Sequence, residues 1–78
     1  MPRYFFNTVD GRRYPDEDGA DLPDMNTVRR KATLVIGELL KEQPADLWDT
    51  GRLRLEVADE AGEIVLMVEV SLIAEIAA

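Results

Sequence analysis

An acidic loop holds the densest group of side chains that could do chemistry. Its carboxylates are those of Asp16, Glu17, Asp18, Asp21 and Asp24. Clustered carboxylates suit a hard cation such as Ca²⁺. When residues 16–19 are aligned with the middle of an EF-hand loop, however, Tyr14 and Met25 fall where oxygen ligands are needed. We therefore predict a solvated turn and no metal site, and we keep binding of calcium or a small ligand by Asp16, Asp18 and Asp21 as an alternative.

The residue types of most catalytic centres are missing from the chain. It contains no cysteine and no histidine. This composition excludes thiolate nucleophiles and disulfides, and it removes the commonest general base and zinc ligand. Ser71 and the threonines have no base to activate them. We therefore predict a protein that is not an enzyme and that has no catalytic residue and no cofactor.

Size and charge restrict the partners of this protein. Its 78 residues include 16 acidic and 9 basic side chains, for a net charge of −7. A negative chain repels phosphate backbones, so we expect no nucleic-acid partner. No apolar run approaches the ~20 residues that span a bilayer, and the N-terminus lacks the pattern of a signal peptide. We expect one domain over residues 1–78, in the cytoplasm of a bacterium-like cell, with no membrane partner.

The first elements that must position the acidic loop are a hairpin and a helix. Residues 3–9 are rich in aromatic and β-branched types and predict a strand. Asp10-Gly11 predicts a tight turn, followed by a short return strand at residues 12–15. Asp24 is a good N-cap for a helix over residues 25–42, whose apolar residues share one face. Gly37 interrupts that helix and suggests a close backbone contact.

A second hairpin follows the helix. Leu53, Leu55 and Val57 alternate with charged residues, as in a half-buried strand. Residues 59–62 predict a turn, and residues 63–71 predict the return strand. Residues 45–51 are expected to form a connector. The fold class is therefore α+β: an antiparallel sheet of three or four strands with one helix on one face, in the order β-β-α-β-β, with a possible short helix over residues 72–78.

The apolar stripe of the helix should face one side of this sheet. The sheet residues expected to contact it are Leu53, Leu55, Val57, Ile64, Leu66 and Val68. The first strand, however, has aromatic residues on both sides, and Val65 and Met67 make the last strand apolar on both sides as well. One helix covers one face, so a second copy of the chain could cover the other. The residues predicted to make such contacts are Tyr4, Phe6, Val65, Met67 and Trp48.

Several segments give this chain a resemblance to a known family. They are Met-Pro-Arg-Tyr-Phe-Phe at residues 1–6, Asp-Gly at 10–11, Pro-Asp-Glu-Asp-Gly at 15–19, Leu-Pro-Asp at 22–24 and Val-Ala-Asp-Glu-Ala-Gly at 57–62. In these segments the chain resembles a family of small bacterial domains of unknown function, which implies a fold but no activity. Asn7 departs from the histidine expected in many members. A looser similarity, in the order of elements, is to the N-terminal domain of the antitoxin of HicAB toxin–antitoxin pairs.

These observations leave three functional hypotheses. The first is a non-enzymatic protein–protein interaction module, forming a homodimer and acting through a sheet face or a free edge strand. The second is an antitoxin-like or regulatory partner that binds a small basic protein through its acidic surface. The third is binding of calcium or a small ligand by the acidic loop. The first is the function that we expect.

Overall fold

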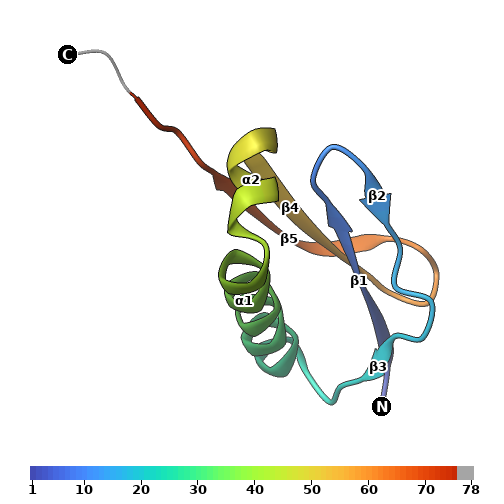
Figure 1. Cartoon of the computed structure of the whole chain (residues 1–78). Helices are drawn as coiled ribbons and strands as arrows, with labels where there is room; N and C mark the ends of the chain where they lie inside the picture. The colour runs from blue at the N-terminus through green and yellow to red at the C-terminus, as the bar shows by residue number, and fades with distance from the viewer. Residues whose placement is uncertain (76–78) are drawn as a thin grey trace.

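The structure is a computed structural model that describes residues 1–75. Its elements are β1 (Arg3–Val9), β2 (Arg13–Tyr14), β3 (Ala20–Asp21), α1 (Met25–Glu42), α2 (Pro44–Thr50), β4 (Arg52–Ala58) and β5 (Ile64–Ser71) (Figure 1). The α+β fold expected from the sequence is confirmed: an antiparallel sheet is covered by one main helix. The sheet gains β3, and a second helix replaces the expected connector.

The sheet has the strand order β2-β1-β4-β5, and β3 pairs with the beginning of β1. All pairs are antiparallel. In the two central strands Phe6 lies opposite Val57 and Thr8 lies opposite Leu55. Strand β1 is therefore internal, because β2 and β3 flank it on one side and β4 on the other. Strand β5 forms the opposite edge of the sheet.

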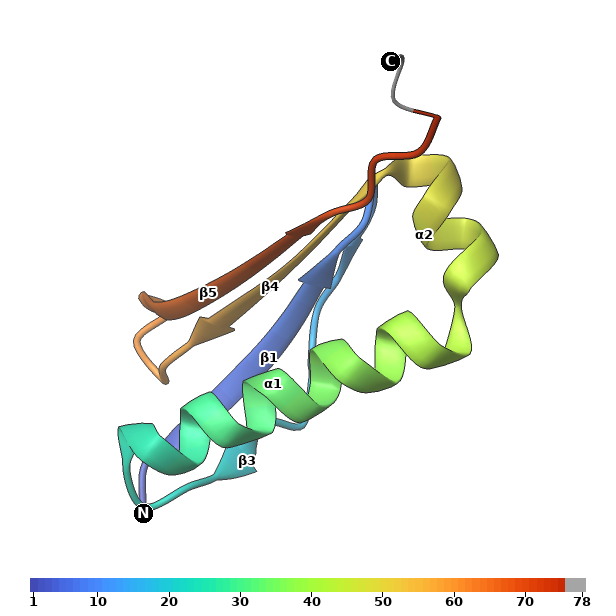
Figure 2. The ribbon, with the colours of Figure 1, turned by 90° about the vertical axis from the view of Figure 1, so that its left-hand side faces the viewer.

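The core lies between α1 and one face of the sheet. Figures 1 and 2 show both helices on the same side of the strands. The predicted helix stripe is buried at Val28, Ala32 and Ile36, and it packs with Tyr4 and Phe6 of β1. The core residues of β4 are Leu53, Leu55 and Val57. The helix begins where expected, because the Asp24 carboxylate accepts the Thr27 N–H at 2.8 Å.

The expected connector at residues 45–51 is mostly helical. Pro44 stands in the first turn of α2, where its missing N–H costs no hydrogen bond. Gly51 ends α2 at a φ of 76°, a left-handed conformation that favours glycine. Leu47 is only 1% exposed and fills the end of the core, whereas Trp48 is 50% exposed. Leu47, and not Trp48, therefore closes the core.

The structure describes only the first part of the expected C-terminal helix. Residues 72–75 form no helix, and Figure 1 shows them continuing away from the sheet. The rest of that expectation concerns residues 76–78, which lie outside the described residues.

The expectation that Ile64 faces the helix was wrong. A register shift between Val57 and Ala58 pairs Val57 with Leu66 but Ala58 with Ile64. The extra residue is Val65, as in a β-bulge. Because residues that lie opposite each other share a face, Ile64 lies with Ala58 and Phe5 on the face away from the helix. Leu66 and Val68 remain on the helix side.

Two glycines give the first prediction. A Cβ at Gly19 would lie 2.9 Å from both the Phe5 ring and the Tyr4 carbonyl oxygen, at a φ of +72°. Gly19→Ala should therefore lower the free energy of unfolding by about 1–3 kcal/mol. Gly37 has no neighbour within 4 Å of its Cβ position, so the close contact suggested by the sequence is absent. Gly37→Ala is the matched control and should stabilise the protein by about 0.5–1 kcal/mol, because alanine is the better helix former.

Urea unfolding of the two variants checks this pair of predictions. Equal midpoints for the two variants would contradict the close packing of the acidic loop on β1.

Candidate interaction surface

Asp16 fills a gap beside β1. Strands β2 and β3 pair with the two ends of β1 and leave its middle without a neighbouring strand. There the Phe6 N–H donates to Asp16 Oδ2 at 3.1 Å. The other carboxylate oxygen accepts the N–H groups of Asp18 and Gly19, at 3.2 and 3.1 Å. The Asp16 N–H donates in turn to Asn7 Oδ1 at 2.8 Å. Asp16 thus supplies an acceptor that a strand would otherwise supply.

These contacts set the charge state of Asp16. Burial alone would raise its pKa, but hydrogen bonds from the N–H groups of Phe6, Gly19 and Asp18 outweigh burial. The pKa of Asp16 is therefore lowered from its ordinary value of 3.8.

Of the other two carboxylates named for the calcium alternative, that of Asp21 is engaged. Asp21 is ion-paired with Arg3, whose Nε lies 3.1 Å from Oδ1, and Arg3 also donates to the Asp18 carbonyl at 3.0 Å. Within residues 1–75, no group of three or more acidic side chains is arranged to hold a metal ion. The geometry therefore gives the calcium alternative no free ligand set.

The sheet face away from the helices is polar at its centre. Glu56 is buried there, and its carboxylate lies 2.8 Å from Arg13 Nη1 and 3.2 Å from Arg54 Nε. Asn7, opposite Glu56 on β1, is buried as well. The apolar residues that the first and last strands place on this face are therefore separated by an ion-paired group on β4, the strand for which the sequence predicted one charged face. Sequence reasoning missed Glu56, whose arginine partners come from two separate strands.

The acidic loop covers part of this same face. Gly19 approaches the ring of Phe5 so closely that no side chain would fit between them. Phe5 is half-buried as a result. A second copy is therefore not needed to cover Phe5, whereas Val65 and Met67 of β5 remain exposed.

The five predicted contact residues lie in three different places. Tyr4 and Phe6 are in the core beneath α1, so they cannot form part of an exposed surface, and this assignment is corrected. Trp48 is exposed on α2, on the helix side of the sheet. Met67 lies opposite Glu56 on the other side, and Val65 lies at the register shift. Of the five, only Val65 and Met67 share one surface.

Along its outer side, strand β5 presents main-chain groups that pair with no other strand among residues 1–75. Neighbouring residues of a strand direct their N–H and C=O groups to opposite sides. The N–H of Leu72 donates to the Gly51 carbonyl at 2.9 Å, on the β4 side. The residues of β5 that bond to β4 are therefore Leu66, Val68 and Val70. The N–H and C=O groups of Met67, Glu69 and Ser71 point outward, and no described residue lies beyond them.

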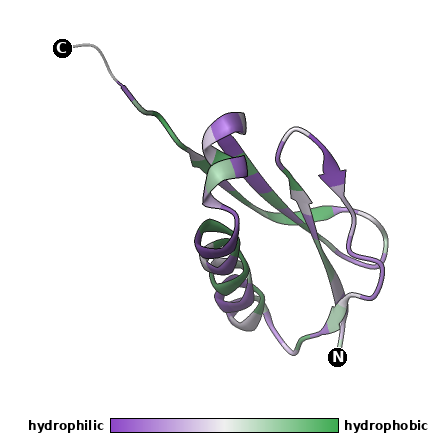
Figure 3. Cartoon of the chain, in the orientation of Figure 1, coloured by the Kyte–Doolittle hydropathy of each residue, from purple (hydrophilic) through white to green (hydrophobic). Residues whose placement is uncertain are grey.

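The two edges of the sheet differ in chemistry. On the side of β1, the neighbours are two-residue strands separated by residues 15–19, which include Pro15 and Asp16 and leave a further strand no continuous row of partners. Strand β5 has eight residues, no proline and a single charge, that of Glu69. In Figure 3 the β2 arrow is hydrophilic, whereas β5 is largely hydrophobic. The long edge is therefore the one open to another strand.

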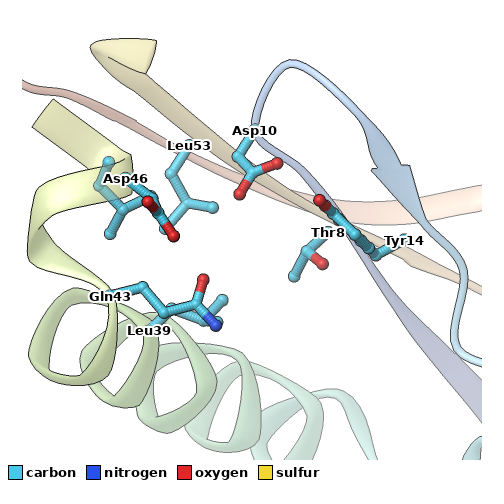
Figure 4. A pocket seen from close by; sticks show the side chains of 8 residues that line it. Thr8, Asp10, Tyr14, Leu39, Gln43, Asp46 and Leu53 are labelled. Atoms are coloured by element: carbon cyan, nitrogen blue, oxygen red, sulfur yellow. The ribbon is translucent and has the colours of Figure 1, made fainter. Parts of the chain in front are cut away.

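A cleft of about 250 Å³ lies between the helices and the β1–β2 turn. Its floor contains Leu39, Leu47 and Leu53, and its mouth contains Asp10 and Asp46. Figure 4 shows both carboxylates directed into the space between the helices and β1. The volume is below the ~300–1,000 Å³ typical of ligand pockets. The cleft provides an acidic, partly apolar depression without a nucleophile beside the carboxylates.

Comparison with known proteins adds a family to this description. The family model described as "Domain of unknown function (DUF6894)" matches residues 3–71. The chain belongs to the DUF6894 family. No curated protein and no solved structure matches it significantly. The bacterial origin and the similarity to HicAB antitoxins stay predictions from the sequence.

The boundaries of the DUF6894 match agree with the sheet. The match begins at the first residue of β1 and ends at the last residue of β5. The edge strand and the Asp16 loop are thus both within the DUF6894 domain. Among residues 1–75 of this DUF6894 chain, no helix has the length and apolar character needed to cross a membrane.

The Asp16 contacts predict a pH dependence. Because the folded-state pKa of Asp16 is lowered, its contribution to stability is fully present above the unfolded value and is lost as the pH falls through the folded value. Asp16→Asn places a donor against backbone N–H groups and should cost about 1–3 kcal/mol at neutral pH. It should also flatten the loss of stability below pH ~4.

Urea unfolding between pH 2 and 7 measures both effects. Asp18→Asn is the control, because only the backbone of Asp18 joins the hydrogen bonds of the loop. If the free energy of unfolding falls equally steeply with decreasing pH in Asp16→Asn and in the unmodified chain, the proposed role of Asp16 is refuted.

Proposed function

We propose that this protein is a non-enzymatic protein–protein interaction module that accepts a strand from its partner at the β5 edge. The observation that carries the proposal is the eight-residue edge, whose outward main-chain groups have no partner among the described residues. An extended segment added to such an edge gains main-chain hydrogen bonds along its length.

The side chains along this edge favour an apolar strand. Ile64, Val65 and Met67 are 50%, 38% and 48% exposed, respectively. On the helix side, Leu66 and Val68 are only partly covered by the core. Main-chain bonds would supply affinity, and these alternate side chains would supply selectivity. The absence of histidine and cysteine supports the non-enzymatic part of the proposal, and a cytoplasmic location stays a prediction.

Selection from a library of random ten-residue peptides tests strand addition. At protein concentrations where the chain is monomeric, the selected peptides should be rich in β-branched residues alternating with other types. Met67→Pro removes an outward N–H without removing a bond to β4 and should weaken peptide binding at least about tenfold. Met67→Ala is the matched control, since it keeps the N–H and shortens the side chain.

The comparison of these two variants separates main-chain from side-chain recognition. Equal loss in both variants would show recognition of an apolar patch and would contradict strand addition. A library that yields no binding peptide would contradict the proposal altogether.

A second candidate is the binding of a small basic protein. Its supporting observation is that Asp10 and Asp46 line the cleft and that both also line an adjoining depression, together with Asp49 and one basic residue, Arg12. Like-charged carboxylates in one depression attract a cation-rich surface at long range.

Titration with a lysine-rich decapeptide, followed by amide chemical shifts, checks this candidate. Asp10, Asp46 and Asp49 should shift first, and the shifts should vanish at about 1 M salt. Shifts spread evenly over all acidic residues would contradict a defined site, and Asp46→Asn combined with Asp49→Asn should remove the effect.

A further inference from the structure

We infer that the strand occupying the β5 edge is β5 of a second copy of this chain, paired antiparallel about a two-fold axis perpendicular to the sheet. The inference rests on the strand-addition proposal and names the partner. It would join the two sheets into one continuous sheet with all the helices on one side.

Symmetry makes β5 complementary to itself. A two-fold axis perpendicular to a sheet preserves its faces, so helix-side residues meet helix-side residues of the other copy. Those residues are Leu66, Val68 and Val70, which are all apolar and half-buried. On the opposite face Met67 is apolar and exposed. Both faces of the joined strands would therefore place apolar side chains together, and the two strands have the same length.

The charges also permit self-pairing at this edge. Glu69 is the single charge on β5, and it lies 3.9 Å from Arg54 of the neighbouring strand. When the axis passes at Met67, Glu69 faces Val65 of the other copy, and when it passes at Val68, Glu69 faces Met67. Neither register sets the two carboxylates opposite each other.

The remaining surface of the chain opposes close approach of two copies. The chain has a net charge of −7, and like-charged surfaces repel each other. The sheet face away from the helices is occupied at its centre by Glu56 with Arg13 and Arg54. The other sheet edge is occupied by Pro15 and Asp16. A nearly neutral β5 is thus the place where two copies can meet over an extended length.

Sedimentation equilibrium and amide hydrogen exchange of the full chain test the inference together. The chain should dimerise, and exchange at the amides of Met67 and Glu69 should slow as its concentration rises. The amides of Leu66 and Val68 should be protected at all concentrations, because they bond to β4. This alternation of protected and concentration-dependent amides holds in either register.

Two variants test the inference quantitatively through the dissociation constant of the dimer. Met67→Pro should raise the dissociation constant of the dimer about 30-fold, because symmetry removes the outward N–H once in each copy. Met67→Ala should change it by less than about tenfold, and circular dichroism shows whether each variant folds. If Met67→Pro does not fold, the exchange pattern of the unmodified chain still decides.

The outcomes separate this inference from the proposed function. A chain that stays monomeric at about 1 mM but binds strand-forming peptides overturns self-pairing and leaves strand addition intact. A dimer whose Met67 and Glu69 amides exchange as fast as in the monomer also overturns self-pairing at this edge. A chain that neither dimerises nor binds peptides overturns both.

Discussion

The sheet depends on β1 having hydrogen-bond partners along both of its sides. Buried main-chain groups without a hydrogen-bond partner would cost free energy, and the stability of so small a sheet would not offset that cost. Strand β4 supplies partners on one side over most of β1. On the other side the chain supplies them in three pieces, which are β2, the carboxylate of Asp16 and β3. A side chain therefore completes what two very short strands leave open.

The same arrangement ties the loop to the helix and so places the core. After β3, Leu22 donates its N–H to the Pro2 carbonyl at 2.9 Å, which holds the chain beside the start of β1. Two residues later Asp24 caps α1. With the start of the helix fixed beside the sheet, Val28 and Ala32 come to rest over the core residues of β1 and β4. The contacts of one loop thus determine where the long helix lies.

Local rules predicted the parts of this fold that depend on local causes. The cap at Asp24 and the helix stripe follow from spacing alone, and both are confirmed. The role of Asp16 could not be predicted, because it depends on a gap opposite Phe6 that exists only once three strands are paired. The side on which Ile64 lies depends on a register shift, and alternation in the sequence assumes that there is none.

The contrast between the two edges has a physical consequence. An exposed, apolar edge strand is a hazard, and proteins usually protect such edges with charge, proline or very short strands. This chain uses those devices beside β1, where Pro15 and Asp16 interrupt the edge, and not along β5. A net charge of −7 keeps copies apart at long range, while the near-neutral β5 leaves one line of approach. Protection at one edge and its absence at the other are most simply explained if β5 receives a strand.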